Sequence, residues 1–218
     1  MDYSYILNSA LPQKEKLEVL GFVEFEGALR LKKEIADGEF YTLIRLSKKS
    51  LTAEVFETLN DEKYVLFDVP SAKGAFVGQI RREVQGIIDE IREKGFDSND
   101  IRQKYMDFIR PEFAAPGDTP WADEGDFKSS VYRCPNGKWF ALVMEIKFKN
   151  LGFESEEPVW AVNLKADAEK IPEITDRKSI FPAYHMNKKY WITVLLTSVT
   201  DFDKLCELTK KSFALVQK

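Results

Sequence analysis

The residues best suited to chemistry stand together near the C-terminal end, in a stretch that reads Tyr-His-Met-Asn-Lys-Lys. Its hydrogen-bonding and basic members are Tyr184, His185, Asn187, Lys188 and Lys189. Lysine ammonium groups neutralise phosphates, histidine and asparagine side chains hydrogen-bond to them, and a tyrosine ring can stack on a nucleobase. The stretch therefore predicts a binding site for an anion, and nucleic-acid phosphate is one such anion.

Further basic residues flank this stretch. Arg177 and Lys178 precede it, and no acidic residue lies between Arg177 and Trp191. Lys165 follows an earlier apolar run, and we expect it to lie at the same end of the sheet. The predicted binding residues are therefore Lys165, Arg177, Lys178, Tyr184, His185, Asn187, Lys188 and Lys189.

Three interpretations of the stretch remain open. In the first, His185 and Asn187 only satisfy backbone groups of a long loop. In the second, the loop binds an anion, either DNA or a small metabolite. In the third, His185 is a general acid or base, but no carboxylate or nucleophile stands at a recognisable spacing from it. We expect a non-enzymatic binding protein without catalytic residues, and keep a small anionic-metabolite binding protein or an enzyme using His185 as alternatives.

The next residues predict how this loop is held. Tyr190–Val194 is an aromatic and β-branched run, which is typical of a buried strand. A rigid strand fixes the position of the polar loop that precedes it, and such loops often carry binding residues.

Several segments resemble the MmcQ/YjbR family. The most specific is Pro182–Val194, and the others occur in the order expected for the family. They are Pro120-Trp121, Lys138–Ala141, Val162–Lys165 and Ser212–Val216. The resemblance covers roughly residues 97–218. One departure is Tyr190, which stands where many members carry a second histidine.

The resemblance implies a fold similar to bacterial frataxin (CyaY), with an antiparallel sheet packed against helices. The family is usually described as DNA-binding, and no reaction is established for it. The resemblance therefore implies DNA as the partner, bound by the basic loop of residues 185–189.

The composition bounds the class of protein. With 44% hydrophobic residues and a net charge of −4 in 218 residues, the chain can form a packed core but does not attract polyanions over long range. The start at Met1 has no signal-peptide pattern, and no apolar run reaches the ~18 residues needed to cross a bilayer. We expect a cytoplasmic protein that does not enter a membrane.

Cys134 and Cys206 lack metal-site spacing, and no phosphate-binding glycine motif occurs, so we expect no metal and no cofactor.

Local patterns predict the secondary structure. In the first half they are a helix over Pro12–Leu20, strands over Phe22–Ile35 and Phe40–Leu46, a helix over Leu51–Leu59, a strand over Tyr64–Val69 and an amphipathic helix over Phe76–Ile91. In the second half they are a helix over Asn99–Ile109 capped by Asp97 or Ser98 and stopped by Pro111, strands over Lys128–Cys134, Lys138–Lys147 and Val159–Leu164, and a last helix from Phe202 capped by Thr200 or Asp201.

These patterns predict an α+β protein with two domains. A smaller α+β domain of unknown role covers residues 1–96, and the MmcQ/YjbR-like domain covers residues 97–218. The boundary is placed at Lys94–Ser98 because Gly95 ends one helix shortly before the next begins. An internal repeat stays open, in which Leu51–Leu59 and Tyr64–Val69 correspond to Ala168–Ile174 and Tyr190–Leu196. The sequence does not predict the oligomeric state.

Overall fold

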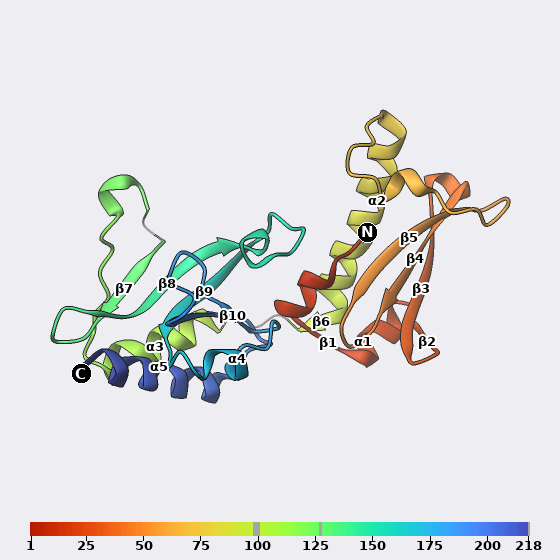
Figure 1. Ribbon diagram of the computed structural model, residues 1–218. Coiled ribbons are helices and arrows are strands. Elements are labelled where there is room, and N and C mark those ends of the chain that lie inside the picture. The colour runs from red at the N-terminus through yellow and green to blue at the C-terminus, as the bar shows by residue number, and fades with distance from the viewer. Residues whose placement is uncertain (98–100, 127, 218) are drawn as a thin grey trace. The chain divides into compact units, whose positions relative to one another are not determined.

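The structure is a computed structural model that describes residues 1–97, 101–126 and 128–217. The chain forms two compact units, Met1–Asp97 and Ser98–Lys218 (Figure 1). Each unit combines helices with an antiparallel sheet, so the chain has the predicted α+β composition. The division between Asp97 and Ser98 lies inside the range Lys94–Ser98, one residue from the predicted domain limits of 1–96 and 97–218. Whether the second unit folds alone stays a prediction.

The first unit is built on a four-stranded sheet in the order β2-β3-β4-β5. Its strands are β2 (Val23–Phe25), β3 (Ala28–Ile35), β4 (Phe40–Leu46) and β5 (Leu51–Glu57), and its helices are α1 (Lys14–Val19) and α2 (Ala75–Gly95). A two-stranded ladder pairs β1 (Leu11–Pro12) with β6 (Phe96–Asp97). Helix α2 buries one apolar stripe, Val77, Ile80, Val84, Ile88 and Ile91, in agreement with the amphipathic helix that the sequence predicts.

The helix predicted over Leu51–Leu59 is wrong, because this segment forms strand β5. Leu51, Ala53 and Val55 are buried and alternate with less buried neighbours, which is the two-residue period of a strand. All seven residues of β5 pair with β4. The helix-forming leucine, alanine and glutamate residues here are overridden by burial on one face of the sheet.

The strand predicted over Tyr64–Val69 is also wrong. Its centre, Val65–Phe67, is a short 3₁₀ helix. The Arg81 guanidinium of α2 donates hydrogen bonds to the carbonyls of Leu66, Phe67, Val69 and Ala72. Those carbonyls are therefore satisfied by a side chain rather than by a neighbouring strand.

The segment Phe22–Ile35, predicted as one strand, is a hairpin of β2 and β3. Glu26 and Gly27 form its turn with φ values of 50° and 78°. Two consecutive positive φ angles define the tight turn that joins twisted antiparallel strands. The segment Ala36–Gly38 joins β3 to β4, and it contains Asp37-Gly38, a dipeptide that is typical of hairpin turns.

The second unit is built on a five-stranded antiparallel sheet in the order β10-β11-β9-β8-β7. The strands are β7 (Ser130–Arg133), β8 (Trp139–Lys147), β9 (Pro158–Lys165), β10 (Ile180–Pro182) and β11 (Trp191–Leu195). The helices are α3 (Arg102–Glu112), α4 (Ile171–Ile174) and α5 (Phe202–Gln217). Strand β10 is short, and all three of its residues pair with β11.

Helices α3 and α5 lie on the same side of this sheet (Figure 1). The core between them holds Tyr105 and Ile109 of α3, Leu205 and Leu208 of α5, and alternate strand residues such as Val162 and Val194. Asp201 caps α5 as predicted, because its Oδ1 accepts a hydrogen bond from the Lys204 N–H at 3.0 Å. The strand residues between these core positions face away from the helices. Some of them are also buried, among them Asn163, Thr193 and Leu195.

The predicted limits of helix α3 need two corrections. Pro111 does not stop the helix, because it sits in the last turn and α3 continues to Glu112. Asp97 does not cap it, because Asp97 pairs with Leu11 and the residue before the helix is Ile101, without a side-chain cap. The alternative cap, Ser98, lies outside the described residues.

The predicted pairing of repeated segments is wrong, because Leu51–Leu59 is a strand and Tyr64–Val69 is not. The two units nevertheless share another order: a helix, four strands adjacent in space in the order β2-β3-β4-β5 or β7-β8-β9-β11, and a closing helix. In neither unit, over the described ranges, is a helix both long and apolar enough to span a membrane.

Candidate functional site

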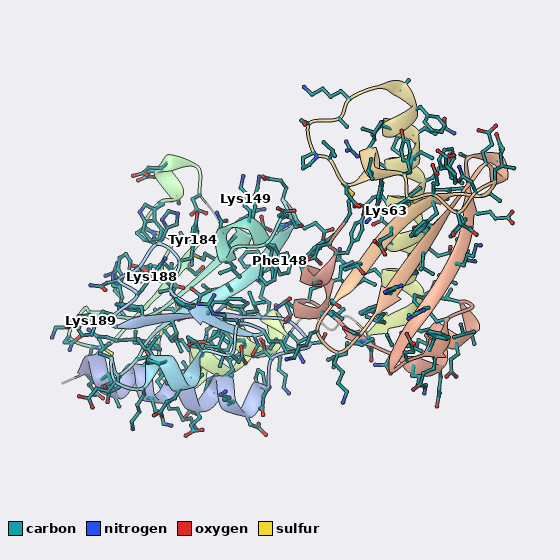
Figure 2. The ribbon with its side chains drawn as sticks, turned by 45° about the vertical axis from the view of Figure 1, so that its right-hand side comes forward. Lys63, Phe148, Lys149, Tyr184, Lys188 and Lys189 are labelled. Atoms are coloured by element: carbon teal, nitrogen blue, oxygen red, sulfur yellow. The ribbon has the colours of Figure 1, made fainter. Side chains whose placement is uncertain are left out.

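A groove of about 470 Å³ opens in the second unit beside the predicted binding loop. One wall comes from the turn after β8, and the other from β10 and the loop that joins it to β11. The lining residues are Asn150, Leu151, Gly152, Arg177, Phe181, Pro182, Ala183, Tyr184, His185, Met186 and Lys188. Figure 2 shows Tyr184, Lys188 and Lys189 following one another along one side of this unit.

Two buried polar residues fix the backbone of the loop at Tyr184. The Asn163 side-chain amide donates to the Tyr184 carbonyl at 2.7 Å, and the Tyr184 N–H donates to Thr193 Oγ1 at 2.9 Å. The Thr193 hydroxyl donates to Asn163 Oδ1 at 2.5 Å, and both side chains are fully buried on paired strands. We call Asn163 and Thr193 the Asn–Thr clamp. Because all three bonds close within the protein, the clamp holds the residue directly before His185 in one position.

His185 and Arg177 both have left-handed backbone conformations, with φ values of 58° and 55°. Such values are uncommon outside glycine and cluster at binding and active sites. His185 is exposed, and its ring centroid lies 4.0 Å from that of Tyr184. The loop therefore presents the imidazole at the groove surface while the tyrosine ring packs behind it.

Arg177 is positioned by a turn built on Asp176. Asp176 Oδ1 accepts hydrogen bonds from the N–H groups of Lys178, Ser179 and Ile180, each at 2.8 Å. Burial favours protonation of Asp176, but these backbone hydrogen bonds outweigh it and hold the pKa of the carboxyl below its usual value of 3.8. The charged carboxylate thus stabilises the turn that points Arg177 toward the groove.

We expect Asp176→Asn to destabilise the second unit by about 1 kcal/mol at pH 7, a modest value because solvent screens this half-exposed group. A carboxyl whose pKa is lowered by folding stabilises the fold above its unfolded pKa, and that stabilisation is lost as pH falls through the folded pKa. The difference from wild type should therefore shrink between pH 7 and pH 3.

Urea unfolding followed by tryptophan fluorescence measures this difference. All four tryptophans, Trp121, Trp139, Trp160 and Trp191, lie in the second unit. Glu173→Gln removes one surface carboxylate of α4 and is the control. An Asp176→Asn deficit that is the same at both pH values would contradict the charged turn.

The other predicted residues have different surroundings. Asn187 Oδ1 accepts the Lys189 N–H at 2.9 Å, and the Asn187 carbonyl accepts the Tyr190 N–H at 3.0 Å, so Asn187 shapes the turn rather than lining the groove. Lys189 lies with its Nζ 5.3 Å from the centre of the Tyr190 ring. Lys178 and Lys189 are not among the groove residues, and Lys165 lines a different groove beside α5.

Sequence reasoning missed the opposite wall of the groove and the clamp. The residues of that wall, Asn150–Gly152, reach the groove only through the packing of the sheet. Behind it, Phe153 contacts Phe148 and Phe181 at ring-centroid distances of 5.8 and 5.9 Å. The clamp left a readable signal, because Asn163 and Thr193 are single polar residues inside otherwise apolar strands.

The groove is cationic and contains no acidic side chain among the residues that line it. Arg177 and Lys188 supply positive charge, His185 supplies a hydrogen-bonding ring, and Leu151, Phe181 and Met186 supply apolar surface. Burial raises the pKa of the Cys134 and Cys206 thiols, which favours the unreactive thiol form. Within the described ranges, no cluster of three or more histidine, cysteine, aspartate or glutamate residues could hold a metal ion.

Each comparison with known proteins matches about half of the chain. The family model YjbR matches residues 114–215, which include every residue that lines the groove. The C-terminal part of the chain belongs to the YjbR family. An uncharacterized protein of Bacillus subtilis, YyaQ, is 28% identical over 120 residues, which cover 53% of this chain and 98% of YyaQ.

Two solved structures are also similar to about half of this chain. A crystal structure of a protein from Pseudomonas syringae is 33% identical and covers 53% of this chain and 97% of its own, with a TM-score of 0.49. The Deinococcus radiodurans protein DR2400 is 26% identical and covers 51% of this chain and 78% of its own, with a TM-score of 0.40.

Proposed function

We propose that the YjbR unit binds nucleic acid, without catalysis, through the groove between residues 150–152 and 177–188. One observation carries the proposal. Arg177, His185 and Lys188 come from two loops and line the same groove, and no acidic residue lines it. Guanidinium and ammonium groups neutralise phosphates, and an imidazole can hydrogen-bond to a phosphate oxygen.

The net charge of the whole chain limits the affinity that we expect for nucleic acid. With a net charge of −4, the protein gains no long-range attraction for a polyanion, so the local cations must supply it. Two or three phosphate contacts give affinity near the non-specific range, about 10⁻⁴ to 10⁻⁶ M. We therefore expect weak, sequence-independent binding.

A small anionic metabolite is the second candidate, and the shape of the groove favours it. A volume of about 470 Å³ is within the range of small-molecule sites. We predicted that Asn187 contacts the bound anion, but its side chain stabilises the turn of its own loop. The anion would therefore be bound by His185, Arg177 and Lys188. An enzymatic role for His185 has less support, because no carboxylate lines the groove beside it.

Two further expectations belong to this proposal. The frataxin-like fold is supported by the order of helix, antiparallel sheet and helix in the YjbR unit. A cytoplasmic location fits a nucleic-acid-binding role and stays a prediction.

The proposal is tested by NMR on the isotope-labelled full chain, titrated with an oligothymidine. We expect amide shift changes at Asn150–Gly152, Arg177, Tyr184–Met186 and Lys188. An uncharged methylphosphonate oligothymidine of the same length is the control, and it should cause no such changes. Shifts caused by inorganic phosphate or a mononucleotide but not by the oligonucleotide would favour the metabolite. Shifts confined to other residues would contradict the proposal.

A further inference from the structure

A second groove, of about 390 Å³, lies beside α5 in the YjbR unit. It is bounded by the end of β9, by α4 and by α5. The lining residues are Lys165, Ala166, Asp167, Lys170, Glu173, Ile174, Lys204, Glu207, Leu208, Lys211, Ala214 and Leu215. The second groove shares no lining residue with the first, so the proposed function does not account for it.

The second groove combines apolar surface with a rim of four lysines. Its apolar lining residues include Ile174, Leu208 and Leu215, of which Leu215 is 38% exposed. Lys211 pairs with Glu207 at 2.5 Å, whereas Lys165, Lys170 and Lys204 form no ion pair within the described ranges. The remaining carboxylates are Asp167, whose Oδ1 accepts the Glu169 N–H, and Glu173. Nucleobases can contact such apolar surface, and the free ammonium groups can contact phosphates.

The two grooves are joined by a short bridge of two residues, Lys189 and Tyr190. Lys188 lines the first groove, and the Tyr190 carbonyl accepts the N–H of Ala166, a residue of the second groove, at 2.9 Å. Residues 188–190 form a turn that the Tyr190 N–H closes by donating to the Asn187 carbonyl, so the bridge spans at most roughly 12 Å, which is the reach of two extended residues and one step between strands and about the length of two nucleotides. Tyr190 is 41% exposed on this bridge, and the Lys189 ammonium lies 5.3 Å from the centre of its ring.

We infer that the first groove, Tyr190 and the second groove form one continuous path for single-stranded nucleic acid. The inference rests on the proposed function and extends it to a ligand class and a second site. Tyr190 offers an aromatic face and a cation between two grooves that each combine apolar surface with cations, which is how proteins bind unpaired strands. A duplex keeps its bases stacked inside, so it cannot use the apolar surfaces.

The path is tested by the dependence of affinity on oligonucleotide length. Fluorescence anisotropy with labelled dT3 and dT12 measures binding to the full chain. We expect dT12 to bind at least tenfold more tightly than dT3, because it reaches both grooves. Lys165→Ala with Lys204→Ala should weaken dT12 about tenfold and leave dT3 unchanged, since each lost phosphate contact weakens binding several-fold at 0.1 M salt.

Substitutions at Tyr190 test the bridge. Tyr190→Ala should weaken dT12 about tenfold, whereas Tyr190→Phe keeps the ring and should match wild type. Lys138→Ala, on the turn between β7 and β8, is the matched control for the loss of a lysine. Tryptophan fluorescence checks that each variant is folded.

The possible outcomes separate this inference from the proposed function. If dT3 and dT12 bind equally, or a 12-base-pair duplex binds as tightly as dT12, the path is wrong and the first groove stands. If Lys138→Ala weakens dT12 as much as the groove variants do, net charge rather than the path determines the binding of dT12, and the path is wrong. If no oligonucleotide binds, both proposals fall.

Discussion

Thr193→Val is expected to destabilise the YjbR unit by about 2–3 kcal/mol and to abolish binding in the first groove. Valine has nearly the shape of threonine, but it can neither accept the Tyr184 N–H nor donate to Asn163 Oδ1. Each polar group that is left buried without a partner costs about 1–3 kcal/mol. Tyr184 and His185 would then lose the position that the Asn–Thr clamp gives them.

Urea unfolding followed by tryptophan fluorescence measures the stability change, and phosphate or oligonucleotide titration measures the binding change. Thr193→Ser is the control, because it keeps the hydroxyl and loses one buried methyl group, worth about 0.8 kcal/mol. It should retain binding. If Thr193→Val is as stable as wild type and binds equally well, the clamp does not position the loop.

The second large effect is expected from Arg177→Gln combined with Lys188→Gln. These are the two permanent cations that line the first groove. Removing two phosphate contacts should weaken oligonucleotide binding about 10- to 100-fold at 0.1 M salt, and by a similar factor for every sequence. Glutamine keeps a long polar side chain, so the loops should not collapse.

The matched control removes the same charge elsewhere, with Lys48→Gln and Lys138→Gln. Both lysines are exposed, and neither lines the first groove. We expect this control to bind as wild type does. Equal losses in the two double variants would mean that net charge, rather than the groove, determines binding.

Local patterns predicted those elements whose signal is carried by neighbouring residues. The helix over residues 75–95 was predictable because its apolar residues recur at helical spacing, and the hairpin of β7 and β8 because Asn136-Gly137 favours a turn. Strand β5 was not, because its helix-forming residues are overruled by pairing with β4. The decisive contact there is not local.

The same distinction applies to the candidate site. The basic loop was recognisable because its polar residues stand together before a strand. Asn187 looked like a ligand, but its carboxamide serves the turn of its own loop. Lys165 was expected beside the loop, yet its N–H donates to Ser212 of α5, so the end of β9 is held against that helix. The wall at Asn150–Gly152 depends on tertiary packing and has no local signal.

The central claim is that cations of the first groove neutralise phosphates, and the salt dependence of binding tests it most directly. The measurement is the slope of log K against log salt concentration for dT3 and the wild-type full chain. With one phosphate contact each to Arg177 and Lys188, dT3, which has two phosphates, should give a slope of about −1.4, flattening toward zero in the Arg177→Gln and Lys188→Gln double variant. A binding constant that does not change with salt, or a slope that the double variant leaves intact, would contradict the account.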